Sequence, residues 1–356
     1  MKKLFVTVSL LIAAALLGCG SGGGGSASNS PQSTPSTNAY LVSTVVLDTA
    51  LNTPAGIAFD GLGDMYVTDP GAQLVRKITN LSSASAHVST ILGGGGTDYS
   101  FCLNSRLDTP SGIAIDSTNK IYVAEVNRTL IRYSDCETNP SVSAQYGSTG
   151  AGLALSTPSG IALRGSNLHV ADTGNHLIRL IANTGGSNGT TTTLAGTSAG
   201  YVNGLTGVAA FFRPSGVAVS SSGNVFVADT NNCAIRLISS GQVTTFAGAL
   251  PSVGGTGVCG SSDGTTTAAR FDHPSAIAID SSNNLYVADT ASNKIRRITP
   301  SGVVTTIAGS GVQGSADGNG SNATFNAPTG ITVDASGNIY VVDSGNRKIR
   351  KIRLTP

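Results

Sequence analysis

Six carboxylate and arginine pairs are the residues of this sequence whose chemistry stands out first. In each pair the arginine follows the carboxylate by seven residues. A titratable pair in a cleft is a candidate for acid–base chemistry, but a cleft needs one such pair and this chain repeats it six times. We therefore predict structural hydrogen bonding within or between equivalent units. The pairs are Asp69 and Arg76, Glu125 and Arg132, Asp172 and Arg179, Asp229 and Arg236, Asp289 and Arg296, and Asp343 and Arg350.

Residues with metal-ligand chemistry are scattered. His87, His169, His176 and His273 lie far apart in the sequence, whereas a zinc site needs several ligands that converge. The stretch 317–322 begins like a calcium-binding loop but lacks the later bidentate glutamate. We find no nucleophile elbow and no phosphate-binding loop. The sequence predicts no catalytic residue, no metal and no cofactor.

The elements that must position these pairs repeat with them. A proline precedes each pair, at intervals of 48 to 60 residues, and an apolar residue stands three positions before each proline. A period of this size, made of short apolar runs, is typical of propellers and solenoids. We interpret the apolar residues as plugs between neighbouring units, each contributing about 1.5 to 3 kcal/mol. They are Leu51, Leu107, Leu155, Phe211, Phe271 and Phe325.

One unit contains four expected strands. In the fifth copy these are residues 276–280, 285–289, 294–299 and 303–308, separated by short polar turns. The first two strands are apolar on both faces, so each sheet must be covered on both sides by its neighbours. The sixth copy lacks a fourth strand, and the unassigned run 40–47 resembles it. We therefore predict an all-β, six-bladed β-propeller of four-stranded antiparallel blades, closed when the N-terminal strand pairs with the last blade.

The repeated phrase resembles a known family. The residues Pro158-Ser159-Gly160-Ile161-Ala162, followed by Ala171-Asp172-Thr173-Gly174-Asn175 and Ile178-Arg179, resemble the NHL repeat. The resemblance covers residues 40 to 354. Glu125 in place of the aspartate and Arg164 at the end of a first strand depart from the pattern. Some similar six-bladed propellers are lyases or lactonases with a metal in the central channel. In this chain the carboxylates that could gather there are Asp60, Asp116, Asp280 and Asp334. Because they recur from blade to blade, we interpret them as turn formers after the first strand.

The N-terminus predicts export. Lys2 and Lys3 precede an apolar run, residues 4–17, that is too short to span a bilayer and is typical of a secretory signal. The following Cys19 completes a resemblance to the lipobox of bacterial lipoprotein precursors, which implies lipidation of Cys19. In the sorting rule of enterobacterial lipoproteins, an aspartate after the cysteine keeps the protein at the inner membrane, and Gly20 stands at that position here. For a Gram-negative source we therefore expect an outer-membrane address. The predicted organisation is a signal peptide over 1–18, a Gly/Ser-rich tether over 19–39 and a propeller over 40–356.

The charge balance excludes one class of partner. The net charge is +2, and removal of Lys2 and Lys3 leaves a mature chain close to neutral. Nucleic-acid binding requires a basic face, so we predict none. We expect a monomer that reaches the membrane through its lipid anchor alone.

The connections between blades break the symmetry. They are long at 93–109, 196–213, 248–273 and 309–327, and short at 48–53 and 147–157. Variable loops on a rigid repeated frame are where propellers place binding. The candidate ligand residues are Tyr99, Arg106, Tyr201, Phe212, Arg270, Asp272 and His273.

Four cysteines follow Cys19, and an oxidising compartment predicts bridges among them. Cys233 lies in an expected turn and Cys259 in the next connection, on the same face, so this pair is the first choice. Cys102 and Cys136 pair by default, although the strand scheme places Cys136 toward the opposite face.

These features favour a membrane-anchored, extracytoplasmic scaffold that binds a protein or glycan, more than an enzyme. The alternative is a propeller enzyme of the lyase or lactonase type with a metal in the central channel. The repeated frame, the variable loops and the lack of a catalytic constellation favour the scaffold.

Overall fold

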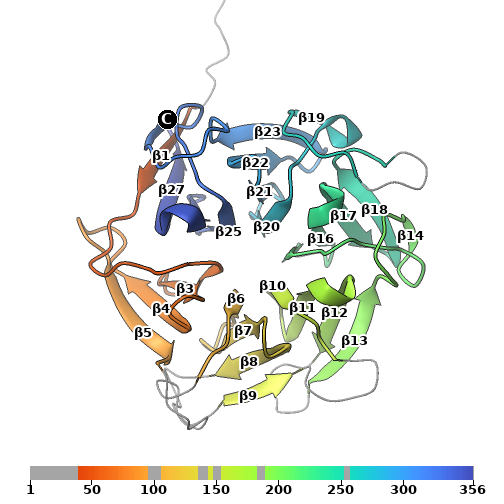
Figure 1. Ribbon diagram of the computed structural model, residues 1–356, viewed down its shortest axis with the longest axis horizontal. Helices are drawn as coiled ribbons and strands as arrows, with labels where there is room; N and C mark the ends of the chain where they lie inside the picture. Colours follow the sequence, from red (N-terminus) through yellow and green to blue (C-terminus); the bar gives the residue numbers. More distant parts are fainter. Residues whose placement is uncertain are drawn as a thin grey trace, which may run out of the picture. The chain divides into compact units, whose positions relative to one another are not determined.

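The computed structural model describes residues 39–94, 106–134, 143–146, 154–182, 189–251 and 257–355. Within these ranges the chain forms six antiparallel sheets arranged in a ring (Figure 1). The predicted six-bladed β-propeller is thus confirmed. None of the helices in the described ranges is long and apolar enough to cross a membrane.

Each of the first three blades is a four-stranded meander whose strands run outward in chain order. The first blade contains β2 (Ile57–Phe59), β3 (Met65–Asp69), β4 (Leu74–Thr79) and β5 (His87–Gly93). The second contains β6 (Pro110–Ile115), β7 (Ile121–Glu125), β8 (Leu130–Ser134) and β9 (Ser143–Tyr146). The third contains β10 (Pro158–Arg164), β11 (Asn167–Asp172), β12 (Leu177–Ala182) and β13 (Thr190–Ala195), with the 3-10 turn η1 (Thr173–Asn175).

The last three blades each carry a fifth, two-residue strand that the sequence did not predict. The fourth blade contains β15 (Gly216–Val219), β16 (Val225–Asp229), β17 (Ala234–Ser239) and β18 (Gln242–Ala247), with η2 (Thr230–Asn232) and the added β14 (Gly204–Leu205). The fifth contains β20 (Pro274–Ile279), β21 (Leu285–Asp289), β22 (Lys294–Ile298) and β23 (Val303–Ala308), with η3 (Thr266–Ala268) and the added β19 (Gly264–Thr265). The sixth contains β25 (Pro328–Val333), β26 (Ile339–Asp343), β27 (Lys348–Leu354) and β1 (Tyr40–Thr44), with η4 (Ser344–Asn346) and the added β24 (Gly318–Asn319).

The N-terminal strand closes the ring as predicted. Strand β1 pairs antiparallel with β27, from Tyr40 opposite Leu354 to Thr44 opposite Arg350. Figure 1 shows the first described strand, in red, lying beside the last, in blue. Because a strand from one end of the chain completes the sheet formed by the other end, the sixth blade cannot form without both.

The core lies between the blades. The second strand of every blade is buried along its full length, apart from Asn167 at the start of β11, as its two-faced apolar composition requires. The six plug residues before the prolines are all at most 3% exposed. Phe325, for example, packs in one cluster with Val42, Val341 and Ile352.

Candidate functional site

The repeated carboxylates hold the start of each blade. In every blade the carboxylate accepts a hydrogen bond from the backbone N–H of the residue that follows the plug. Asp289 accepts this bond from Asp272 at 2.6 Å, and Asp343 accepts it from Asn326 at 2.7 Å. In the other blades the donors are Asn52, Asp108, Ser156 and Phe212. This recurrence assigns the carboxylates to the frame.

Five of the six carboxylates also form a buried ion pair with their arginine. The N···O distances are 2.5 Å for Glu125 and Arg132, 2.8 Å for Asp172 and Arg179, 2.7 Å for Asp229 and Arg236, 2.9 Å for Asp289 and Arg296, and 2.8 Å for Asp343 and Arg350. Burial, which outweighs the nearby guanidinium, raises the pKa of Asp229 and of Asp289 to about 6.

The first blade departs from this pattern. Arg76 donates to the hydroxyl of Thr90, and no ion pair with Asp69 occurs among the described residues. Asp69 instead accepts bonds from the backbone N–H groups of both Asn52 and Thr53. One of the six predicted pairs is therefore not a contact pair.

The arginines of the last three blades also donate hydrogen bonds to the connection that leads into their blade from the previous one. Arg296 donates to the carbonyl oxygens of Arg270 and Ser262, each at 2.9 Å, and to the carboxylate of Asp263 at 2.8 Å. Arg236 contacts Asn203, and Arg350 contacts Asp317, in the same way. Sequence reasoning missed these partners. The available signal is an Asn-Gly or Asp-Gly that begins eleven residues before the proline, at 203–204, 263–264 and 317–318.

Asp317 is therefore part of the frame and not of a calcium loop. Its carboxylate accepts bonds from the backbone N–H and the hydroxyl of Thr44, each at 3.0 Å, as well as from Arg350. Asp317 thus joins the closing strand β1 to β27.

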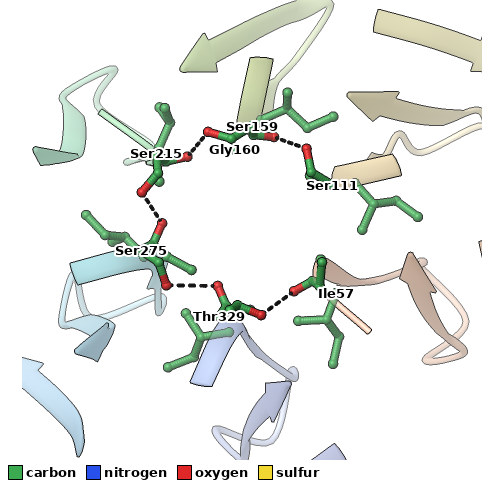
Figure 2. Close-up of a pocket in the computed structure, with 18 residues that line it drawn as sticks. Ile57, Ser111, Ser159, Gly160, Ser215, Ser275 and Thr329 are labelled. Carbon is green, nitrogen blue, oxygen red and sulfur yellow. Dashed lines mark hydrogen bonds between the residues drawn. The ribbon is translucent and has the colours of Figure 1, made fainter. Parts of the chain in front are cut away.

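The central channel is surrounded by a belt of hydroxyl groups (Figure 2). Each hydroxyl donates to a carbonyl oxygen at the start of the next blade: Ser159 to Ser215 and Ser215 to Ser275, both at 2.9 Å, and Ser275 to Thr329 at 3.2 Å. Thr329 donates to the carbonyl of Ala55 at 3.3 Å, so the belt continues from the last blade to the first.

The channel residues do not fit a metal. The cavity of about 210 Å³ is lined by Ser, Thr, Gly, Ala and β-branched aliphatic residues. None of these residues supplies a carboxylate, an imidazole or a thiolate. The hydroxyl groups of the belt already donate to carbonyl oxygens. The lining therefore lacks the ligands that a metal-dependent enzyme would need in its channel.

The four aspartates expected near the channel are turn formers. Asp280 accepts bonds from the backbone N–H groups of Ser282 and Asn284 and from the hydroxyl of Tyr286. Asp60, Asp116 and Asp334 accept equivalent bonds within their own turns. These carboxylates stabilise the turn between the first and second strands.

Two of the predicted ligand residues are structural. The hydroxyl of Tyr201 lies 2.9 Å from that of Thr245, and its ring lies 4.5 Å from the guanidinium of Arg236. Arg270 donates to the carbonyl oxygens of Thr267 and Ala269 within its own connection. Both side chains therefore stabilise the connections in which they lie.

Three of the predicted residues, Phe212, Asp272 and His273, precede the first strands of the fourth and fifth blades and lie two or three positions before the channel-lining Ser215 and Ser275. The half-buried ring of Phe212 is 5.7 Å from that of His176, beside the exposed Arg213. Burial, and then the charge of Arg213, lower the pKa of His176. In the next blade the ring of His273 lies 2.7 Å from the carboxylate of Asp272. We name His176, Phe212, Arg213, Asp272 and His273 the rim.

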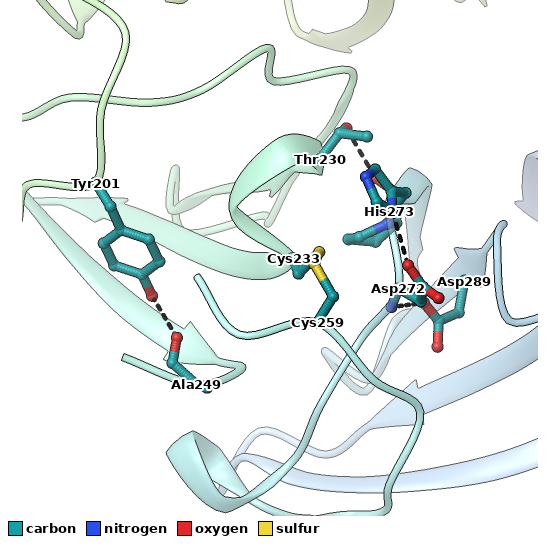
Figure 3. Close-up of a disulfide and its surroundings, with 9 residues drawn as sticks. Tyr201, Thr230, Cys233, Ala249, Cys259, Asp272, His273 and Asp289 are labelled. Carbon is teal, nitrogen blue, oxygen red and sulfur yellow. Dashed lines mark hydrogen bonds and ion pairs between the residues drawn. A yellow bond between two sulfur atoms is a disulfide. The ribbon is translucent and has the colours of Figure 1, made fainter. Parts of the chain in front are cut away.

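The other predicted ligand residues and the cysteines remain to be placed, and some of them lie outside the described ranges. Arg106 is exposed in the connection before the second blade. Tyr99, Cys19, Cys102 and Cys136 lie outside the described residues. The predicted disulfide between Cys233 and Cys259 is confirmed, with Cα atoms 5.1 Å apart, and it joins η2 to the next connection (Figure 3).

The ring of sheets and the repeated contacts define a six-bladed β-propeller whose units share a buried carboxylate, paired with an arginine in five of the six blades. Two of these units match the family model for the NHL repeat, at residues 211–236 and 325–352. The chain is also 30% identical to NHL repeat-containing protein 2 of Bos taurus over 293 residues, 70% of this chain. The match spans only 39% of that relative's length.

Solved structures share the fold. One is an auxiliary nutrient binding protein from Bacteroides thetaiotaomicron, with a TM-score of 0.66 and 18% identity, covering 88% of this chain and 76% of that one. Another is a catalytically inactive virginiamycin B lyase from Staphylococcus aureus, with a TM-score of 0.56 and 17% identity, covering 89% and 100%. Identity this low establishes the fold and leaves activity open.

Proposed function

We propose that this propeller is a lipid-anchored, exported binding module whose rim contacts a protein or glycan ligand. The observation that carries the proposal is the contrast between the channel and the rim. The channel lining consists of aliphatic side chains and hydroxyl groups that donate to carbonyl oxygens. The rim combines an aromatic ring, an exposed guanidinium, an imidazole and a carboxylate.

The chemistry of the rim suits such a ligand. An aromatic face such as that of Phe212 packs against the apolar face of a sugar ring or against a peptide side chain. The exposed guanidinium of Arg213 recognises a carboxylate through paired hydrogen bonds. A binding role is also consistent with the fold shared with a nutrient binding protein.

Ligand arrays test the binding role. We expect the full-length protein to bind members of a glycan array or a peptide array, and Phe212→Ala combined with Arg213→Ala to weaken that binding at least tenfold. The matched control is Leu62→Ala, because Leu62 is 80% exposed in a turn at the opposite end of the blades. Equal binding by the rim variant and the wild type would contradict the proposal, as would equal losses in both variants. Deleting the connection 248–273 is a poorer test because it removes the plug Phe271 and strand β19.

The lipid anchor is tested separately. A Cys19→Ser variant should move from the detergent-extracted membrane fraction to the soluble fraction, because stable attachment requires the acyl chains. Mass spectrometry of the wild-type N-terminal peptide should show an acylated cysteine. Unchanged fractionation of the variant would refute the anchor and leave the binding proposal untouched.

The alternative of a metal enzyme is tested by elemental analysis. The channel lining supplies no suitable ligand set, so the oxidised protein should contain no stoichiometric calcium, zinc or iron. One equivalent of any of these ions would favour the enzyme.

A further inference from the structure

Among the described residues, the junction between the fourth and fifth blades lacks a hydrogen bond that the junctions on either side of it have. At those two junctions, the turn after the second strand ends in a residue with a positive φ. The side chain of this residue accepts a hydrogen bond from the backbone N–H of the residue just before the proline of the next blade. His176 accepts the N–H of Arg213 at 3.1 Å, and Asn293 accepts that of Ala327 at 2.9 Å. At the junction of the fourth and fifth blades this position is Cys233, with a φ of 51°. Sulfur is a weak acceptor, so Cys233 is a poor substitute for His176 or Asn293 as the acceptor of this bond.

The residues around Cys233 form a set of metal-ligand types. Its sulfur, that of Cys259, a carboxylate oxygen of Asp272 and a ring nitrogen of His273 all lie within 4.8 Å of one another. Figure 3 shows the disulfide with Asp272 and His273 beside it. The spacing of the four histidines does not indicate this site, because its other ligands are two cysteines and an aspartate.

Backbone hydrogen bonds hold two residues of this set, Asp272 and Cys233, in place. The N–H of Asp272 donates to the buried carboxylate of Asp289 at 2.6 Å, and its carbonyl accepts from Ala291 at 3.0 Å. The N–H of Cys233 donates to the carbonyl of Thr230 at 3.1 Å, at the end of η2. Asp272 and Cys233 therefore project from backbone that is fixed by hydrogen bonds, as a metal site requires.

We propose that reduction of the Cys233–Cys259 disulfide creates a zinc site formed by the two thiolates, His273 and Asp272. A dithiol, or a phosphine with water, supplies two electrons to the S–S bond and becomes a disulfide or a phosphine oxide. The two sulfurs become thiols, and both lose their protons when Zn²⁺ binds. The disulfide and the metal therefore exclude each other.

The geometry needs only a small adjustment. Tetrahedral zinc with bonds of about 2.0 to 2.3 Å places its ligand atoms about 3.3 to 3.8 Å apart. Cleaving the S–S bond lets the two sulfurs separate to this spacing, and the distances between the other ligand atoms must shorten by about 1 Å. Two thiolates and an imidazole favour zinc over magnesium or calcium. Cys259 and His273 are exposed, so the ion has a path from solvent.

Metal titration of the full-length protein tests this site. The protein is reduced with a phosphine under anaerobic conditions and titrated with Co²⁺ as a spectroscopic probe, then with Zn²⁺ against a chromophoric chelator. We expect one equivalent to bind, with a thiolate-to-cobalt charge-transfer band and the visible bands of tetrahedral cobalt. The oxidised protein should show neither band. Equal binding by the oxidised protein, or no binding by the reduced protein, would overturn the proposal.

Variants locate the site within the chain. His273→Ala should weaken zinc binding about 10- to 100-fold or more, because it removes a ligand. The matched control is His87→Ala, which removes an exposed histidine that lies 2.6 Å from Asp48 without a cysteine partner. Cys259→Ser should abolish the two-thiolate spectrum, and Cys102→Ser with Cys136→Ser should leave it unchanged. Wild-type affinity in His273→Ala, or loss of the spectrum only in the Cys102 and Cys136 variant, would place the metal elsewhere.

Discussion

At the scale of single residues, the buried arginine does more than neutralise its carboxylate. Arg296 joins Asp289 on the strand before it to two carbonyl oxygens and a carboxylate of the incoming connection. One side chain therefore connects three segments of chain. A buried guanidinium is tolerated because its charge is paired and most of its donors are bonded.

This bonding predicts unequal effects of two equivalent substitutions. Arg296→Met should lower the free energy of unfolding by about 3 to 5 kcal/mol, because it leaves a buried carboxylate without its partner. Arg76→Met should cost less, since Arg76 bonds to Thr90 and forms no ion pair with Asp69 within the described residues. Urea unfolding of both variants measures the difference. Equal losses would show that the ion pair is not what distinguishes the two positions.

Asp317 adds a pH dependence of known sign. Partial burial alone would raise its pKa, but hydrogen bonds from Thr44 and Arg350 outweigh burial and lower the pKa from its usual value of 3.8. Because the pKa is lower in the folded state, the carboxylate stabilises the fold above the unfolded pKa, and this contribution is lost as the pH falls through the folded pKa.

We therefore expect Asp317→Asn to lower stability by about 1 kcal/mol at neutral pH, a modest value because the carboxylate is 46% exposed. The difference from wild type should shrink toward zero in acid below pH 3.8. Thermal unfolding of both proteins at several pH values measures it. A difference that stays constant into acid would show that the charge of Asp317 is not responsible.

The sequence predicted which residues form the frame better than it predicted their partners. The spacing of seven identified each carboxylate and arginine, because it reflects the register of two adjacent strands. The backbone N–H of Asp272 and the carboxylate of Asp263 belong to connections of irregular length. Their contacts depend on the path of the chain in space, which periodicity does not encode.

At the scale of elements, the connections differ most from expectation. The sequence predicted long connections on one face, and the structure adds that three of them pair with the outer strand of the next blade through β14, β19 and β24. Two-residue strands such as Gly264–Thr265 have no alternation to recognise. The disulfide was predictable because blade topology alone brings Cys233 and Cys259 to the same face.

The disulfide should stabilise the connection that it closes. With a sequence separation of 26 residues, loop-closure entropy gives about 3.5 kcal/mol. We expect Cys233→Ser combined with Cys259→Ser to lower the free energy of unfolding by about 2 to 4 kcal/mol under oxidising conditions. Urea unfolding measures this loss, with the single variant Cys259→Ser as the control that should match it. A negligible loss would mean that the connection is already fixed by its other contacts.

At the scale of the whole molecule, two devices close the ring. One is the hydroxyl belt, in which Thr329 of the last blade donates to Ala55 of the first. The other is the pairing of β1 with β27. The sequence predicted the second from a missing strand and an unassigned apolar run. It did not predict the belt, because Ser and Thr are common turn residues and their bonds cross between blades.

Closure predicts that a change in the first strand weakens the entire propeller. Val42 is 1% exposed and packs with Phe325 and Ile352, whereas Val46 is 57% exposed. Val42→Ala should cost about 2 kcal/mol, from two lost methyl groups and the space they leave, and Val46→Ala should stay within about 0.5 kcal/mol of wild type. Urea unfolding measures both.

Hydrogen exchange then separates global from local weakening. Because β1 completes the sheet that adjoins the first blade, Val42→Ala should speed exchange of the most protected amides in all blades by a similar factor, about 30-fold for a 2 kcal/mol loss. Faster exchange confined to β1 and β27, with β16 and β21 unchanged, would mean that the last blade opens alone. The propeller would then behave as separate blades, and closure would not be the source of its cooperativity.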